Sequence, residues 1–191
     1  MKYIKKFNEN FIDFDKSTDF HKHNKIWFGA SADISSVEKF IQHTKDNIDT
    51  FIELGAGDLS KSIKASENFK NVYSIELYPE YVKYCQDLIK EKNIKNINLI
   101  EGDILKDIHK LPQIKSAIYS FVPFTNNEKN IEMVKMYVNY FPKDSCFFFI
   151  GLEGIIINIK EKGELPELEM IGEVINYKLN KNSDIIYWRK K

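Results

Sequence analysis

The sequence has little of several features whose scarcity excludes particular kinds of protein. Only one basic residue, Arg189, is an arginine, so bidentate recognition of phosphates or guanine edges is nearly unavailable. The charges of the 28 Asp and Glu residues balance those of the 28 Lys and Arg residues, so no net positive charge attracts a polyanion. We therefore do not expect a nucleic-acid partner.

Potential metal-binding residues are also few. The two cysteines, Cys85 and Cys146, lie in different apolar segments without the short spacing of a zinc knuckle or a disulfide framework. His21 and His23 stand close together, but no third ligand follows at a recognisable spacing. We expect no metal site and interpret both cysteines as buried thiols.

Long hydrophobic runs are absent. The richest run, residues 146–150, is far shorter than the roughly 20 apolar residues that cross a bilayer. The first residues are basic but no uninterrupted apolar region follows them, unlike in a secretory signal. These observations predict a cytoplasmic protein without an integral membrane segment.

The length of 191 residues favours one compact domain, here residues 35–191, preceded by an N-terminal helix and linker in residues 1–34. In residues 2–16, side chains three and four positions apart form one apolar stripe: Ile4, Phe7, Phe11 and Phe14. This amphipathic helix either packs onto the domain or inserts its aromatic face into a lipid surface beside lysines, as a peripheral membrane contact. Both interpretations remain open.

From residue 50 onward, strand-like and helix-like patterns alternate. The expected strands are 50–54, 71–76, 97–101, 116–121 and 146–151, and the expected helices are 60–68, 79–92 and 128–141, with a short helical turn near 104–108 and an earlier helix from 36. Two further strand-like runs, 169–179 and 184–189, flank a loop over 180–183. The pattern predicts an α/β fold with a doubly wound, Rossmann-like, mainly parallel sheet closed by a C-terminal antiparallel hairpin.

A glycine turn directly after the first of these strands is the most informative segment. Gly55 and Gly57 permit a sharp turn and a close approach of the backbone to a ligand. Glu53 precedes them by two residues, where its carboxylate suits a cationic ligand and repels a dinucleotide pyrophosphate. The turn therefore favours a cationic nucleoside over a dinucleotide.

Two more carboxylates follow the next two strands. Glu76 ends a strand about 20 residues beyond the glycine turn, where an acidic residue accepts ribose hydroxyls. Asp103 follows the third strand and is suited to accept a hydrogen bond from an adenine amino group. Together with the glycine turn, they indicate a site for an adenosine with a cationic tail.

These residues and the reversed terminal hairpin resemble the class I S-adenosylmethionine-dependent methyltransferases over residues 35–189. The resemblance implies S-adenosylmethionine as cofactor, with Leu77 packed on the adenine and the backbone of Ile104 helping to hold it. This chain departs from the family pattern at Leu59, where a third glycine is common.

The fourth strand ends in residues 119–124, where a methyl donor and acceptor would meet in that family. Val122, Pro123 and Phe124 partly resemble the rRNA adenine dimethyltransferases, but Phe121 replaces the Asn that would accept amine hydrogens. Adenine methylation therefore ranks low.

The run from Ser120 to Phe124 is more similar to small bacterial phosphatidylethanolamine N-methyltransferases, as are the loop with Gly29, Ala30, Ser35 and Ser36, the ending Tyr187-Trp188-Arg189 and the first helix. Aromatic faces bind the quaternary ammonium that repeated methylation creates, and suitable ones occur at Trp27, Tyr78, Tyr119 and Phe124. We expect Ser120, Tyr119 and Phe124 to form the catalytic part of the site, with Ser120 orienting the amine.

The sequence thus predicts an S-adenosylmethionine-dependent N-methyltransferase acting on an amine, with a phospholipid headgroup as the first hypothesis for the acceptor. Protein lysine methylation is the alternative enzymatic hypothesis. A non-catalytic binding module with the same fold is the alternative from another class, and a dehydrogenase is disfavoured by Glu53 and the reversed hairpin.

Overall fold

The computed structural model describes residues 34–121, 124, 126–171 and 187–191, and everything below concerns these residues. The expected helix over residues 2–16 and its linker fall outside them, so the predicted division into residues 1–34 and 35–191 stays a prediction.

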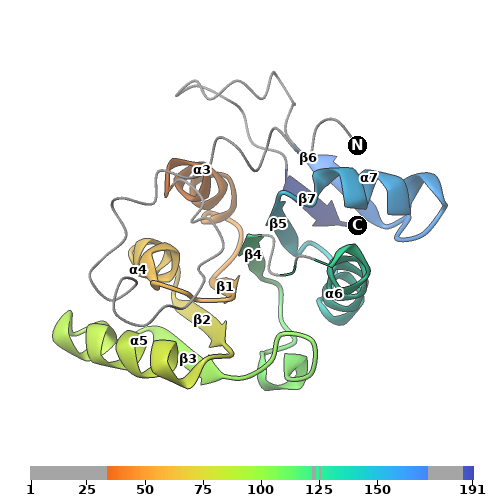
Figure 1. Cartoon of the computed structure of the whole chain (residues 1–191). Coiled ribbons are helices and arrows are strands. Elements are labelled where there is room, and N and C mark those ends of the chain that lie inside the picture. The colour runs from red at the N-terminus through yellow and green to blue at the C-terminus, as the bar shows by residue number, and fades with distance from the viewer. Residues whose placement is uncertain (1–33, 122–123, 125, 172–186) are drawn as a thin grey trace. The chain divides into compact units, whose positions relative to one another are not determined.

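The described strands form one seven-stranded sheet in the order β3-β2-β1-β4-β5-β7-β6 (Figure 1). Their bounds are β1 Thr50–Leu54, β2 Asn71–Glu76, β3 Ile97–Glu101, β4 Ala117–Phe121, β5 Cys146–Ile150, β6 Leu168–Ile171 and β7 Tyr187–Lys190. The pairings among β1 to β5 are parallel, whereas β7 runs antiparallel to both β5 and β6. The predicted fold class, a mainly parallel doubly wound sheet with a reversed C-terminal pair, is confirmed.

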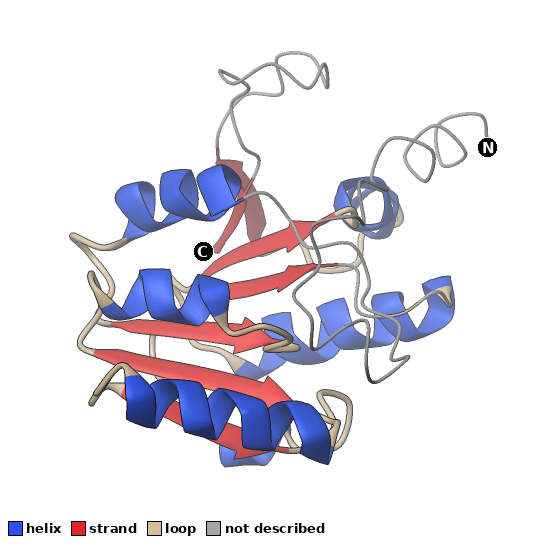
Figure 2. Cartoon of the chain, turned by 60° about the vertical axis from the view of Figure 1, so that its left-hand side comes forward, coloured by secondary structure: helices blue, strands red, loops and turns tan. Residues whose placement is uncertain are grey.

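Helices cover both faces of this sheet (Figures 1 and 2). The described helices are α3 Ile34–Thr44, α4 Ser60–Ser66, α5 Pro79–Glu91, α6 Asn127–Tyr140 and α7 Glu153–Glu161, with a 3-10 helix η2 at Ile108–Lys110. In Figure 1, α3, α4 and α5 lie on one side of the sheet and α6 and α7 on the other. None of the helices in the described ranges is long and apolar enough to cross a membrane.

The structure differs from the expected elements in two places within the described residues. Helix α7 was not expected at all, and the helical turn expected near 104–108 is a turn at 104–106 followed by η2. Of the expected runs 169–179 and 184–189, the described residues include strands β6 and β7, and residues 172–186 lie outside the described ranges.

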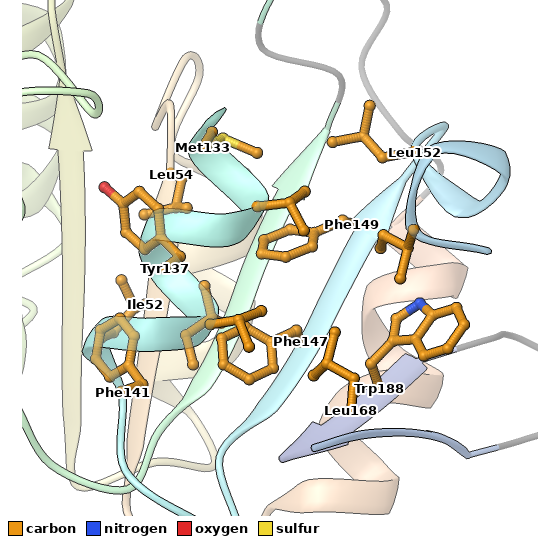
Figure 3. Packing of buried hydrophobic residues seen from close by; sticks show 14 of the residues in the cluster. Ile52, Leu54, Met133, Tyr137, Phe141, Phe147, Phe149, Leu152, Leu168 and Trp188 are labelled. Atoms are coloured by element: carbon orange, nitrogen blue, oxygen red, sulfur yellow. The ribbon is translucent and has the colours of Figure 1, made fainter. Parts of the chain in front are cut away.

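The main core lies between the sheet and helices α6 and α7 (Figure 3). Side chains from alternate positions of the strands enter it, including Ile52 and Leu54 of β1 and Phe147 and Phe149 of β5. On the opposite face of β5, Phe148 packs against Phe40 of α3 with ring centroids 5.2 Å apart. All residues of β5 are buried because helices cover both faces, which explains its continuous apolar run.

Candidate cofactor and acceptor site

The glycine turn leaves β1 at the carboxyl edge of the sheet. The N–H groups of Gly55 and Ala56 both donate to the carbonyl oxygen of Ile75 in β2, at 3.0 and 3.1 Å. Gly55 has a φ of +84° and Gly57 a φ of +50°, both in the left-handed region that favours glycine. A Cβ built on Gly55 would meet nothing within 4 Å, so backbone conformation rather than space requires glycine there.

Leu59, where a third glycine was expected from the resemblance, is also left-handed. Leu59 has a φ of 61° and a ψ of 3°, a left-handed conformation that glycine adopts without steric cost. Its side chain is nonetheless fully buried. This chain therefore keeps the backbone of a glycine turn while placing an apolar side chain into the core.

Glu53 lies under helix α4. Its Oε2 accepts hydrogen bonds from the N–H and the Oγ of Ser62, at 3.1 and 2.5 Å, and Ser62 Oγ is 2.5 Å from Ser74 Oγ. Burial raises the pKa of this carboxyl group to about 8, so it is mainly protonated at neutral pH. In this structure Glu53 joins α4 to the sheet, and its predicted contact with a cofactor stays a prediction.

Glu76 joins the end of β2 to the glycine turn. Its Oε2 accepts the N–H of Gly57 at 2.9 Å, and its Oε1 accepts the N–H groups of Leu77 and Tyr78 at 2.9 and 3.1 Å. Gly57 is held from its other side as well, because Cys85 of α5 donates its S–H to the Gly57 carbonyl oxygen at 3.4 Å. Both polar backbone groups of Gly57 are therefore satisfied by side chains far away in the sequence.

Two large side chains beside Glu76 remain exposed. Leu77 is 52% and Tyr78 51% accessible, so both present apolar surface directly beside Glu76. An apolar surface of this kind suits the face of a flat heteroaromatic ring.

The third strand end lies next to the second, because the N–H of Gly102 donates to the carbonyl oxygen of Glu76 at 2.9 Å. Asp103 accepts the N–H of Leu105 at 2.9 Å and donates its own N–H to Asp107 Oδ2 at 2.8 Å. The sequence-predicted residues Gly57, Glu76, Leu77, Asp103 and Ile104 thus come from adjoining strand ends at one edge of the sheet.

The fourth strand places two of its predicted site residues on opposite faces of the sheet, as neighbours in a strand must be. Ser120 is fully buried and its Oγ lies 3.3 Å from the carbonyl oxygen of Leu54, at the end of β1. Tyr119 is 2% exposed, with its ring between those of Phe51 and Phe148. Its hydroxyl has no hydrogen-bond partner within the described ranges, and burial raises its pKa well above the ordinary value.

Phe124 follows β4 and is half-buried. Its carbonyl oxygen accepts a hydrogen bond from Asn130 Nδ2 at 2.8 Å, and Lys129 Nζ lies 5.8 Å from the centroid of its ring. Val122, Pro123 and the proposed wall residue Trp27 lie outside the described residues.

Sequence reasoning missed several residues that support the site, namely Cys85, Gly102, Asp107, Asn130 and Tyr137. Only Gly102 carries a local signal, because it directly precedes Asp103. Across the described part of the chain, no three His, Cys, Asp or Glu side chains come together in a group that could hold a metal ion.

Comparison with known proteins supports the fold more than any one activity. No family model matches the chain. A stretch of 63 residues, 33% of this chain, is 36% identical to an uncharacterized protein of Methanocaldococcus jannaschii, and it spans only 24% of that relative's length.

Solved structures resemble the chain over most of its length. One, named as a methyltransferase of Streptococcus mutans and bound to S-adenosylhomocysteine (SAH), has a TM-score of 0.64 and 12% identity, covering 82% of this chain and 98% of that one. A precorrin-6y C5,15-methyltransferase of Geobacter metallireducens has a TM-score of 0.56 and 15% identity, covering 93% and 95%. An rRNA methylase of Streptococcus thermophilus has a TM-score of 0.56 and 10% identity, covering 79% and 92%.

None of these three names mentions a phospholipid, so the likeness to phosphatidylethanolamine N-methyltransferases has no support beyond the sequence pattern. What the solved structures share with this chain is the three-dimensional arrangement. The chain has the fold of the class I S-adenosylmethionine-dependent methyltransferases.

Proposed function

We propose that this protein is an S-adenosylmethionine-dependent methyltransferase that acts on an amine nitrogen. The observation that carries the proposal is the junction of the left-handed glycine turn with Glu76 and the exposed Leu77 at one edge of the sheet. A relative of the same fold binds SAH, the product that such a reaction leaves.

In this proposal the adenosine lies across the ends of β1, β2 and β3. The exposed side chain of Leu77 packs on the adenine, and the backbone of Ile104 and the Asp103 carboxylate hold its edge. Oε1 of Glu76 already accepts two backbone N–H groups, whereas Oε2 accepts one. Because a carboxylate oxygen has about two acceptor positions, Oε2 is the atom free to accept a ribose hydroxyl.

The methyl acceptor lies beyond β4, next to Phe124. Lys129 Nζ lies 5.8 Å from the centroid of this ring, and this contact supports the proposal that the ring also attracts a cationic amine product. Ser120, near the end of β4, donates its hydroxyl to the Leu54 carbonyl oxygen at the end of β1, and it orients the amine through this hydroxyl or its backbone carbonyl. The first hypothesis for the acceptor remains a phospholipid headgroup, with a protein lysine as the alternative.

When bound, S-adenosylmethionine supplies a methyl group on a sulfonium. The amine lone pair forms the new N–C bond while the C–S bond breaks, and its electrons return to sulfur. The protein's own contribution is alignment and exclusion of water. Glu53 is bonded to Ser62, and Tyr119 lies among aromatic rings on the face of β4 opposite Ser120, so we assign the removal of the amine proton to water.

Tyr119→Phe tests whether Tyr119 takes part in removing the amine proton. The variant removes a buried hydroxyl that has no partner in the described structure, so we expect unchanged or slightly higher stability and an unchanged rate of methyl transfer. A loss of transfer in a stably folded Tyr119→Phe protein would restore Tyr119 as a catalytic residue.

Calorimetric titration of the purified full chain with S-adenosylmethionine and SAH tests the cofactor. Gly57→Asp should abolish binding for two reasons. It places a residue with a Cβ at a positive φ, and it adds a negative charge beside Glu76. Gly163→Asp is the matched control, since Gly163 has a φ of +77° at the end of α7. Equal affinities for both variants and wild type would refute the cofactor site.

The acceptor is tested with methyl-labelled S-adenosylmethionine and a cell extract containing membranes, separated into lipid, RNA, protein and small-molecule fractions. Label in lipid that requires Gly57 supports the phospholipid hypothesis, and label in protein supports lysine. Label in RNA would contradict the amine-headgroup proposal and agree with the rRNA methylase of the same fold. Cofactor binding without label in any fraction would favour the non-catalytic binding module.

A further inference from the structure

Helix α6 has two buried polar side chains on a face that is otherwise apolar. Met133, Val134 and Val138 enter the core from this face, and Asn130 and Tyr137 are as deeply buried, at 1% and 0% exposure. Asn130 and Tyr137 are seven residues apart, so they lie on the same side of the helix about 10 Å from each other along its axis. Buried polar groups are costly unless they make hydrogen bonds, so the partners of these two indicate their purpose.

Tyr137 binds the backbone on the cofactor side of the site. Its hydroxyl donates to the carbonyl oxygen of Ile104 at 2.9 Å, across 33 positions of sequence. Figure 3 shows the ring next to Leu54 with its hydroxyl directed away from Phe147 and Phe149. Ile104 follows Asp103 directly, so Tyr137 fixes the peptide on which the adenine edge would rest.

Asn130 binds the backbone on the acceptor side. Its Nδ2 donates to the carbonyl oxygen of Phe124 at 2.8 Å. Its Oδ1 is buried and has no partner among the described residues. An unsatisfied buried amide oxygen lowers the stability of the folded protein. The bond from Asn130 to Phe124 therefore points to a function for this side chain other than stability.

We infer that α6 is a brace for the two loops of the site, in which Tyr137 and Asn130 are positioning residues for the adenine-side and acceptor-side backbones. This inference rests on the proposed function and adds residues to it that neither the glycine turn nor the strand-end motifs include. A helix that holds the backbone at both Ile104 and Phe124 fixes the distance between the methyl donor and the acceptor, on which an in-line displacement depends.

Tyr137→Phe tests the adenine side, with Tyr140→Phe as the matched control. Tyr140, also on α6, donates its hydroxyl at 2.8 Å to the carbonyl oxygen of Leu111, away from Ile104. Each variant loses one hydroxyl-to-backbone hydrogen bond. We expect Tyr137→Phe to weaken binding of S-adenosylmethionine and SAH by the same factor, about fivefold, because both ligands have the adenine.

Tyr140→Phe should leave both affinities within about twofold of wild type. Equal loss in the two variants would mean that Tyr137 acts only through overall stability, and the adenine-side inference would be overturned. If the wild-type protein binds neither ligand, the proposed function is contradicted. If the wild-type protein binds both ligands but Tyr137→Phe and Tyr140→Phe lose affinity equally, only the role of Tyr137 as a positioning residue is contradicted.

Asn130→Leu tests the acceptor side. Leucine has nearly the shape of asparagine, and removal of the unsatisfied Oδ1 offsets much of the cost of losing the bond to Phe124, so melting should show only a small loss of stability. We expect cofactor affinity to stay within about twofold, while methyl transfer to the extract fraction that wild type labels slows about tenfold. Asn130→Ala gives a second variant without added bulk. Unchanged transfer in either folded variant would overturn the acceptor-side role.

Discussion

Leu59 provides a strict test of the glycine turn because its backbone and its side chain have opposite requirements. Its left-handed backbone costs a residue with a Cβ about 1–2 kcal/mol. Its side chain is fully buried, and truncation of a buried leucine to alanine typically costs about 3–5 kcal/mol. The two contributions can be separated by comparing alanine with glycine at the same position.

Both Leu59→Ala and Leu59→Gly lose the buried side chain, but only glycine removes the backbone strain. We expect unfolding in urea to show Leu59→Ala destabilised by about 3 kcal/mol and Leu59→Gly by about 2 kcal/mol. Glycine should therefore be the more stable of the two by about 1 kcal/mol, the reverse of the usual order in helices.

Ile41 is the matched control for this pair. It is 1% exposed and lies inside helix α3, and it is not among the described residues with a positive φ. There, Ile41→Gly should be less stable than Ile41→Ala by about 1 kcal/mol. If the Leu59 pair shows the same order as the Ile41 pair, the left-handed turn and the comparison with a third glycine are both refuted.

Three other predictions concern groups around the turn. Because burial raises the pKa of Glu53 to about 8, folded protein holds a proton that unfolded protein releases above about pH 4.5, so stability falls as pH rises toward 8. Urea unfolding at pH 5.5 and 8.5 should show this fall in wild type and a smaller one in Glu53→Gln. A Cβ on Gly102 would lie 2.9 Å from Asp107 Oδ2, so Gly102→Ala should lower stability and cofactor affinity, whereas Gly154→Ala in α7, with nothing within 4 Å, should raise stability by about 0.5–1 kcal/mol. Burial raises the pKa of the Cys85 thiol to about 12, so iodoacetamide at pH 8 should leave it unmodified until urea unfolds the protein, and rapid labelling of the native protein would contradict its burial.

The alternation of strands and helices was predictable because the strands are short and largely apolar, and β1, β2, β3 and β5 end at or directly before a glycine or a carboxylate. Helix α7 was not, because its residues include Gly154 and three successive β-branched isoleucines, 155–157, which have low helix propensity. Tertiary packing stabilises α7 as a helix, because Ile156 and Ile159 are buried in the core that it shares with α6.

The candidate site was predictable where a function depends on local sequence and unpredictable where it depends on contacts across the fold. Gly55 and Gly57 directly after an apolar run predict a turn from the local sequence alone. By contrast, the bond from Tyr137 to Ile104 crosses 33 positions, and that from Cys85 to Gly57 crosses 28. Strand alternation alone places Tyr119 and Ser120 on opposite faces of the sheet, and the structure places Tyr119 among aromatic rings.

The double attachment of Gly57 has a thermodynamic consequence for ligand capture. Its N–H and carbonyl groups are bonded to Glu76 and Cys85 without any ligand, so the turn loses its conformational freedom when the chain folds. A nucleoside that binds beside this turn does not have to order it, and more of its contact energy is retained as affinity. We expect slow hydrogen exchange at the Gly57 amide in the free protein, and a rate of ligand association limited by diffusion and desolvation.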